Sequence, residues 1–360
     1  MQTVAVLGAG AGGAAAVAEL SQRGYYVRLW NRSSETLRPY RSAGGVRFEG
    51  VLGRGIAVPM VITENLAEAV KAADVVLVCL PTFSHAPIAR ELAQIECKLP
   101  VVLNPGHTGG ALEFRAAYAA VSPDLPPIAE FSTLTYVARK YEQDKTSVTG
   151  KADSVRVAAL PNGQRALDFA RQLYPGISVE SDVLASDLAN VNMVLHCPGA
   201  VLGAAWVEAT NGDFTFYVQG MTHGVARVMS QLDAERRSVA AAFGHDLPSL
   251  VEEMQAIGTV PSSWSDVRDI AGAVSSGEAN KKIKAPDSFK HRYYLEDFGH
   301  GLLPFLQFAA VAGVRTPVAQ SLYELAAAAT GIDFAATGRT AERMGFDAGD
   351  LESLIRIVRE

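Results

Sequence analysis

Short apolar runs alternate with helix-like stretches along the first half of the chain. Residues 3–7 (TVAVL) and 25–30 (YYVRLW) indicate strands, and the Ala-rich stretch 14–23 indicates a helix. The runs 75–80 and 101–103 are apolar throughout, as strands are when both of their faces are covered. This alternation predicts a parallel sheet with right-handed crossovers.

The second half has a different pattern, in which long stretches contain Ala, Leu and Glu and strand signals nearly vanish. We place a boundary near residues 175–183, which gives domains of 1–180 and 181–360. The predicted fold is α/β plus all-α: an N-terminal Rossmann-type doubly wound parallel sheet, then a C-terminal helical domain. The polar segment 258–290 is expected to be a loop with one short helix. Helices are predicted over 185–208, 216–243, 247–257, 301–312 and 317–330.

Composition and charge narrow the class of protein. Of 360 residues, 49% are hydrophobic and 19% are charged, which is typical of a soluble globular protein. The net charge of −6 argues against nucleic-acid binding, and no run of 18 apolar residues predicts a membrane span. The cysteines and histidines lack metal-ligand spacing, so no metal is predicted and the cysteines are expected to be buried free thiols. We expect a cytoplasmic location.

The first motif that carries chemistry is the sequence Gly8-Ala9-Gly10-Ala11-Gly12-Gly13. It follows the first predicted strand and opens the first predicted helix, as a dinucleotide-binding turn does. Gly8 would allow the tight turn, Gly10 would let a pyrophosphate approach the backbone, and Gly13 would let the helix pack close to the strand. The alternative is a glycine-rich turn without a ligand.

The end of the second strand bears on the choice of cofactor. An Asp or Glu at this point binds the ribose 2′-hydroxyl in NAD sites. Here the strand ends Asn31-Arg32-Ser33, without a carboxylate. A guanidinium and a hydroxyl suit a 2′-phosphate, so NADP(H) is predicted, with NAD(H) still possible. The alternative is that Arg32 is a solvated loop residue.

Two further loops follow later strands and should line the nicotinamide end of the cofactor, mainly through their backbone. Pro81 follows the strand at 75–80, while Asn104 and Thr108 follow the strand at 101–103. Ligands of open α/β sheets lie outside the carboxyl ends of the strands. An ordinary Pro- and Gly-containing turn is the alternative.

The helical half offers one candidate acid/base and one mixed cluster. His196 lies four residues after Asn192, so both face the same side of a predicted helix, which Pro198 is expected to bend or interrupt. A histidine on an apolar helix is more often a core residue than a proton carrier. The cluster at 291–297 (HRYYLED) combines a guanidinium, aromatic rings and carboxylates, although a solvated helix start is the commoner origin of such a pattern.

Taken together, these segments resemble the NAD(P)-dependent octopine/opine dehydrogenases, in particular the shorter bacterial type, over nearly the whole chain. The glycine turn is common to many dehydrogenases, whereas the run 103–115 and the ordered set His196, Arg292 and Asp297 are more specific. The matching segments are 8–13, 103–115, 190–192 with His196, 233–236, 292–293 with 296–297, and 338–340.

The resemblance implies reductive condensation of an amino acid with a 2-oxo acid such as pyruvate, through an imine. It implies that His196 is the acid/base, that Asp297 orients and stabilises it, and that Arg292 holds the oxo-acid carboxylate. It also implies that Glu130 binds the amino acid's ammonium group. The partners of the protein would be small-molecule substrates, with no nucleic acid or membrane, and we expect a homodimer. The resemblance implies that the helical domain 181–360 serves substrate binding and dimerisation.

This chain departs from the family pattern in two places. Several members end the second strand with an acid where this chain has Asn31-Arg32, and side chains differ near 107 and 131–137, so the amino-acid substrate stays open. One alternative is a reductase of a single carbonyl substrate, like ketopantoate reductase or a 2-hydroxyacid dehydrogenase. Another is an NADPH-sensing binding protein without catalysis.

Overall fold

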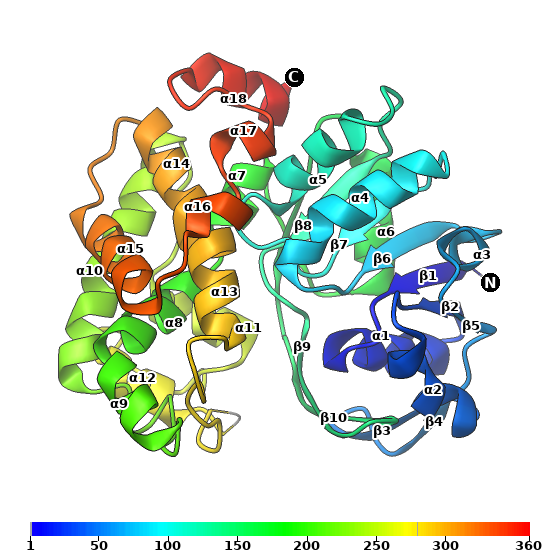
Figure 1. Cartoon of the computed structure of the whole chain (residues 1–360), viewed down its shortest axis with the longest axis horizontal. Coiled ribbons are helices and arrows are strands. Elements are labelled where there is room, and N and C mark those ends of the chain that lie inside the picture. Colours follow the sequence, from blue (N-terminus) through cyan, green and yellow to red (C-terminus); the bar gives the residue numbers. More distant parts are fainter. Residues whose placement is uncertain (1, 279) are drawn as a thin grey trace. The chain divides into compact units, whose positions relative to one another are not determined.

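The computed structural model describes residues 2–278 and 280–360. The chain forms two compact units (Figure 1). The first unit contains the residues up to 106 together with 110–183, and the second contains 107–109 together with 184–360. Residues 107–109 therefore belong with the helical part of the chain, although they lie within the sequence of the sheet-containing part.

The first unit is built on a mixed, mostly parallel sheet with strand order β12-β11-β8-β7-β6-β1-β2-β5. All of its pairs are parallel except β8 with β11. This confirms the predicted Rossmann-type sheet and its strands. Its strands are β1 (Thr3–Leu7), β2 (Tyr26–Trp30), β5 (Val61–Thr63), β6 (Val75–Val78), β7 (Val101–Leu103), β8 (Ile128–Phe131), β11 (Arg156–Ala159) and β12 (Ser178–Val179).

Helices and a short 3₁₀ turn connect these strands and cover the sheet. Helices α4 and α5 pack against each other, and α6 packs against β7, β8 and β11 (Figure 1). The helical elements of this unit are α1 (Ala11–Gln22), α2 (Ser34–Ser42), α3 (Leu66–Val70), η1 (Thr82–Ser84), α4 (His85–Gln94), α5 (Gly110–Ala119) and α6 (Gln164–Leu173).

Strand β1 lies inside the sheet, where it fixes the position of the glycine turn. It pairs with β2 on one side and β6 on the other, and Val4 to Leu7 are fully buried. The small side chains of Ala14 to Ala18 on α1 are also fully buried, which allows close packing of the helix. Because both neighbouring strands hold β1, the turn that follows Leu7 is anchored in the core of the unit.

A second, four-stranded sheet was not predicted from the sequence. Its order is β4-β3-β10-β9, and α1 packs against it. The buried carboxylate of Glu19 on α1 accepts a hydrogen bond from the Tyr136 hydroxyl at 2.8 Å and pairs with Lys151. These contacts attach the second sheet to the helix that follows the glycine turn. Its strands are β3 (Val46–Gly50), β4 (Gly55–Ala57), β9 (Tyr136–Glu142) and β10 (Lys145–Lys151).

The second unit is helical, and within the residues described there its only strand-like pairing is a single bridge between Thr215 and Lys284. The predicted helical domain is thus confirmed. Its elements are α7 (Val183–Leu188), α8 (Asn192–Leu202), α9 (Ala204–Thr210), α10 (His223–Ala242), α11 (Leu250–Ile257), α12 (Ile270–Ser276), α13 (Arg292–Asp297), the π-helical turn η2 (Phe298–Leu302), α14 (Leu303–Val311), α15 (Pro317–Thr330), α16 (Phe334–Thr337), α17 (Ala341–Met344) and α18 (Leu351–Arg359).

Several predicted helix boundaries need correction. The stretch 185–208 is divided among three helices, and α8 continues through Pro198, which does not interrupt it. The bend of 66° comes instead at Gly203, where a Cβ would lie 2.7 Å from the carbonyl oxygen of Gly199.

Other boundaries follow local capping. Helix α10 begins at His223, not at 216, because the Thr222 side chain accepts a hydrogen bond from Val225 N and so caps the helix. The predicted helix 317–330 is confirmed, as is one short helix, α12, within 258–290, of which residue 279 lies outside the described residues.

Among the described residues no single helix is long and apolar enough to cross a membrane; only α7–α8 and α9 together, as a bent pair, meet that test.

Candidate functional site

The glycine turn between β1 and α1 has the geometry of a cofactor cradle. Gly8 has φ +120°, and a Cβ there would lie 2.4 Å from the carbonyl oxygen of Cys79. A Cβ on Gly13 would lie 1.8 Å from the carbonyl oxygen of Gly8, so neither position accepts a side chain. Gly10 is different, because a Cβ there would meet no atom within 4 Å. The open space beside Gly10 is where a pyrophosphate would approach the backbone, so these residues fit a dinucleotide.

The first turn of α1 suits an anion. Gly10 is the N-cap and makes no side-chain capping bond, and the first turn contains no acidic residue. The free N–H groups and the positive end of the helix dipole therefore point toward the cradle without a competing carboxylate.

The residues at the end of β2 have three distinct roles in the structure. The Asn31 side-chain oxygen accepts a hydrogen bond from Ala9 N at 3.2 Å, which ties this strand end to the glycine turn. Ser33 is the N-cap of α2, where its hydroxyl accepts a hydrogen bond from Thr36 N at 3.2 Å. Arg32 is exposed and makes no hydrogen bond or ion pair among the described residues. Of the three, Arg32 has a charged group available for a 2′-phosphate.

The loop residues after β6 and β7 present backbone more than side chain. Pro81 is exposed and is the N-cap of η1. The Asn104 side chain is buried and engaged with Thr135, donating to its hydroxyl at 2.9 Å and accepting from its N–H at 3.2 Å. Asn104 therefore holds the segment around Thr135 in place, and Leu134 of that segment packs against Gly12.

Thr108 lies in the helical unit, where its polar groups are engaged. Its hydroxyl accepts from the Asn190 side-chain amide at 3.1 Å and donates to the Asp187 carbonyl at 3.3 Å. Its own carbonyl accepts from the Arg339 guanidinium at 2.9 Å. These contacts stabilise the segment 107–109 within the second unit, so the predicted role of Thr108 with the cofactor stays a prediction.

Glu130, the residue predicted to bind an ammonium group, lies on β8 and is buried. Its carboxylate accepts a hydrogen bond from Ala111 N at the start of α5, at 2.8 Å. A Cβ on Gly106 would lie 2.0 Å from the same carboxylate oxygen. Glu130 thus holds the start of α5 close to Gly106, and the described contacts do not themselves favour the substrate role.

His196 and Asp297 form a buried dyad in the helical unit. His196 lies on α8 and Asp297 ends α13, and the His196 Nδ1 lies 2.8 Å from the Asp297 carboxylate. An ionised carboxylate only accepts hydrogen bonds, so Nδ1 carries the proton and Nε2 is the atom available for acid/base chemistry. On the other side of the ring, Nε2 lies 2.6 Å from the Tyr217 hydroxyl.

The surroundings keep the Asp297 carboxyl ionised. Burial alone would raise its pKa, but the neighbouring His196, with its charge and its hydrogen bond, and then His107 and Arg292, together lower the pKa below its ordinary value. An ionised Asp297 can both orient the imidazole and stabilise it when it becomes protonated.

Arg292 lies one helical turn before the dyad's carboxylate. Its side chain is 59% exposed, and its Nε lies 3.3 Å from the carboxylate of Glu296. Burial opposes the charge, but Glu296 and Asp297 outweigh it and raise the pKa of Arg292, which stays protonated. Much of the guanidinium is thus open to an incoming carboxylate.

Tyr217 and Tyr293 surround His196, and no motif pointed to Tyr217. The Tyr293 ring stacks on the imidazole with centroids 3.9 Å apart and planes 15° apart, and its hydroxyl lies 3.3 Å from that of Tyr217. Tyr293 is part of the 291–297 cluster. Tyr217 follows Phe214 and Phe216 in the loop between α9 and α10. This cluster of aromatic residues in a loop was the only feature of the sequence that could have marked Tyr217 as a candidate site residue.

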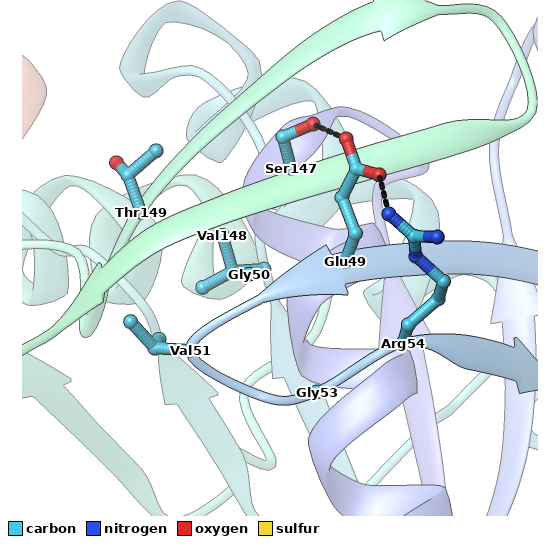
Figure 2. Close-up of a pocket in the computed structure, with 8 residues that line it drawn as sticks. All are labelled: Glu49, Gly50, Val51, Gly53, Arg54, Ser147, Val148 and Thr149. Carbon is cyan, nitrogen blue, oxygen red and sulfur yellow. Dashed lines mark hydrogen bonds and ion pairs between the residues drawn. The ribbon is translucent and has the colours of Figure 1, made fainter.

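Other features are separate from these groups. Figure 2 shows a surface groove on the four-stranded sheet, where Glu49 accepts from the Ser147 hydroxyl at 2.9 Å and lies 3.8 Å from Arg54. None of the predicted site residues lines this groove. The three cysteines are free and buried, as predicted, and the described residues contain no cluster of three or more metal-ligating side chains.

The chain matches two known families over separate stretches. Residues 4–103 match ketopantoate reductase PanE/ApbA. Residues 179–330 match the α-helical domain of the NAD/NADP octopine/nopaline dehydrogenases.

Similar proteins match over nearly the full length. Opine dehydrogenase of Arthrobacter sp. (strain 1C) is 32% identical over 349 residues, which cover 96% of this chain and 95% of that protein. A structure of octopine dehydrogenase with NADH and pyruvate matches with a TM-score of 0.76 and 22% identity, covering 99% of this chain and 98% of the other. Yersinopine dehydrogenase with NADP+ matches with a TM-score of 0.73 and 16% identity, covering 97% and 96%.

Proposed function

Because the chain belongs to the opine dehydrogenase family, we propose that it is an NADP(H)-dependent enzyme that joins an amino acid to a 2-oxo acid by reductive condensation. The observation that carries this proposal is the buried pair of His196 and Asp297, with Arg292 one turn away on the same helix as Asp297. A carbonyl or imine substrate needs a proton carrier, and a 2-oxo acid needs a cation for its carboxylate.

Each residue has a definite part in the reaction. Arg292 binds the oxo-acid carboxylate with its guanidinium. The amine attacks the carbonyl carbon of the oxo acid, and one N–H proton moves to the carbonyl oxygen to give a carbinolamine. His196 supplies the second proton to that oxygen, so that the C–O bond breaks, water leaves and a protonated C=N bond forms. Asp297 stabilises the imidazolium before this transfer. A nicotinamide cofactor, with its pyrophosphate at the turn that contains Gly8, Gly10 and Gly13, would supply the hydride that reduces this C=N bond to a secondary amine.

The preference for NADP(H) rests on Arg32. Its exposed guanidinium follows β2 at the point where an acid would select NAD, and it has no partner among the described residues. Yersinopine dehydrogenase was solved with NADP+ and octopine dehydrogenase with NADH, so the fold accepts both cofactors. Comparing kcat/KM for NADPH and NADH in the purified enzyme tests the preference, and a higher value with NADH would contradict it.

The condensation is tested by the dependence of NADPH oxidation on both substrates. We expect little oxidation with pyruvate, glyoxylate or 2-oxoglutarate alone, and rapid oxidation when the correct amino acid is added. Mass spectrometry should then find a product with the mass of the secondary amine. Oxidation that does not depend on the amine would favour a single-carbonyl reductase, the activity of the family that residues 4–103 match. NADPH binding without turnover across the panel would favour a binding protein.

The role of His196 has its own test. His196→Ala should reduce kcat by roughly 10²–10⁴-fold, the typical loss when a general acid/base is removed. It should leave NADPH binding intact, as measured by fluorescence titration. His223→Ala, which removes an exposed imidazole at the start of α10, is the matched control and should keep full activity. Wild-type turnover in His196→Ala would refute the acid/base role.

A further inference from the structure

The atom of His196 that should exchange protons with a substrate already has a hydrogen-bond partner. Nδ1 is bonded to Asp297, and Nε2 lies 2.6 Å from the Tyr217 hydroxyl. A neutral imidazole has one donor and one acceptor nitrogen, so Tyr217 donates to Nε2 in this state. A substrate could contact Nε2 directly only if the imidazole or Tyr217 moved.

The imidazole is held on three sides. The bond from Nδ1 to Asp297 fixes one edge, and Tyr293 stacks on its face with centroids 3.9 Å apart. The Phe216 ring centroid lies 6.2 Å away. Rotation of the ring would break the bond to a buried carboxylate, which is costly because the charge would lose its partner.

Tyr217 is held as well. Its hydroxyl lies 3.3 Å from that of Tyr293, and its ring meets Phe216 edge-on at 5.2 Å. The loop segment just before Tyr217 is fixed by two backbone hydrogen bonds, because Phe216 N donates to Ile283 O at 2.9 Å and Ala285 N donates to Phe214 O at 2.9 Å. Tyr217 is buried, with 6% of its surface exposed. These contacts oppose its withdrawal from Nε2.

We propose that Tyr217 is a further catalytic residue, whose hydroxyl stands between His196 Nε2 and the substrate and relays the proton. This inference rests on the proposed function. As the substrate oxygen or nitrogen takes the proton from Tyr217, the phenol O–H bond breaks and an O–H or N–H bond forms on the substrate. The Nε2–H bond of the imidazolium breaks in the same step, and its proton restores the Tyr217 hydroxyl.

The relay moves protons only and leaves His196 neutral. A bound nicotinamide would supply the hydride separately, and solvent returns the proton to His196 before the next cycle. The Tyr293 hydroxyl donates to the Tyr217 oxygen while negative charge develops there, which stabilises the transition state.

The competing arrangement is a gate, in which Tyr217 occupies Nε2 only in the empty enzyme and leaves when substrate binds. The two arrangements predict opposite effects of Tyr217→Phe, which keeps the ring and removes the hydroxyl. A relay loses its proton path, and we expect kcat to fall by about 10²-fold, as for a lost general acid, with KM for NADPH unchanged. A gate would lose a competitor for Nε2, so wild-type or faster turnover would overturn the relay.

Tyr294→Phe is the matched control for this substitution. Tyr294 is also buried, with 1% of its surface exposed, and its hydroxyl donates to Ala200 O at 2.9 Å and not to a residue of the dyad. It should lose stability to a similar extent but keep its kcat. A comparable loss of kcat in both variants would show that Tyr217 acts only through the fold.

A measurement on the unmodified enzyme removes any dependence on the folding of variants. A relay moves two protons in one step. Where proton transfer limits the rate, a plot of kcat against the fraction of D2O in the solvent should therefore be curved, because two exchangeable hydrogens contribute to the isotope effect. A straight line, which indicates one proton, would overturn the relay.

The outcome for Tyr217 is separable from that of the proposed function. If NADPH oxidation proves independent of the amine, condensation is refuted, and the same two measurements on the carbonyl substrate still decide the relay. If His196→Ala loses activity while Tyr217→Phe does not, the proposed function stands and the relay is refuted. An enzyme that turns over no carbonyl substrate would refute both.

Discussion

At the scale of single residues, the helix α13 presents two charges with different tasks. Arg292 at its start is more than half exposed, whereas Asp297 at its end is 5% exposed and bonded to His196. An exposed cation can exchange water for a ligand carboxylate at low cost, whereas the buried anion is committed to its imidazole. Substitution of the two residues should therefore affect different kinetic constants.

Arg292→Ala should raise the KM for the 2-oxo acid by about 10–100-fold, because a hydrogen bond to a charged group contributes roughly 1.5–3 kcal/mol. The KM for NADPH should not change. Arg292→Lys keeps the charge without the planar fork and should give an intermediate KM. The measurement is initial velocity against oxo-acid concentration at saturating amino acid, and an unchanged KM in Arg292→Ala would exclude this residue from carboxylate binding.

At the scale of elements, the turn between β1 and α1 contains two kinds of glycine. Two are required by the packing of the fold, and one is open on the side where a cofactor would bind. Gly8 and Gly13 have no room for a Cβ, so larger residues there would disrupt packing. Gly10 has room in the protein, and only a bound cofactor would compete for that space.

Gly10→Ala should therefore fold with an unchanged Tm and bind NADPH at least about tenfold more weakly, a loss of about 1.4 kcal/mol. Gly224→Ala, near the start of α10, is the matched control: its Cβ would meet nothing closer than 3.7 Å, and it should bind NADPH normally. Titration of NADPH fluorescence with a parallel thermal melt measures both effects. Normal NADPH affinity in Gly10→Ala would place the cofactor elsewhere.

The elements also show what the sequence could predict. Strands such as β1 and β6 were predictable because burial on both faces leaves continuous apolar runs. The four-stranded sheet was not, because β3 mixes buried and exposed positions in VRFEG and pairs with the distant β10, so its order depends on contacts that a local pattern does not contain. His196 and Asp297 were found through the family resemblance, whereas the position of Tyr217 depends on the path of a loop.

At the scale of the whole molecule, the residues proposed for cofactor binding and those proposed for acid/base chemistry belong to different units. The glycine turn and Arg32 belong to the first unit, and His196, Arg292 and Asp297 belong to the second. The predicted homodimer stays a prediction, which light scattering of the purified protein can test.

The stability of the whole chain also depends on buried groups that have no part in the proposed chemistry, and His300 is one of them.

His300 lies in the π-helical turn η2, where burial lowers its pKa to about 3 from an ordinary value of 6.5. The unfolded chain binds this proton more readily than the folded chain does. The stabilisation from a neutral His300 is therefore complete above about pH 6.5 and is lost as the pH falls toward 3. The free energy of unfolding should fall by up to about 1.4 kcal/mol per pH unit from this group.

His300→Gln removes this titration, so its free energy of unfolding should fall less steeply than that of the wild type between pH 6 and pH 4. Urea unfolding at several pH values measures both slopes. His223→Gln, which changes an exposed imidazole, should keep the wild-type slope. Parallel slopes for wild type and His300→Gln would contradict the assignment.

The short segment 107–109 has a consequence for recombination of such proteins. A chimera that joins this sheet-containing half to the helical half of a relative at residue 183 would supply a foreign 107–109 to the new helical half. The bonds of Thr108 to Asn190, Asp187 and Arg339 would then join residues of different ancestry. A swap of the complete helical unit between relatives therefore needs two replacements, residues 107–109 and residues 184–360, because a single crossover at residue 183 exchanges only the second of them.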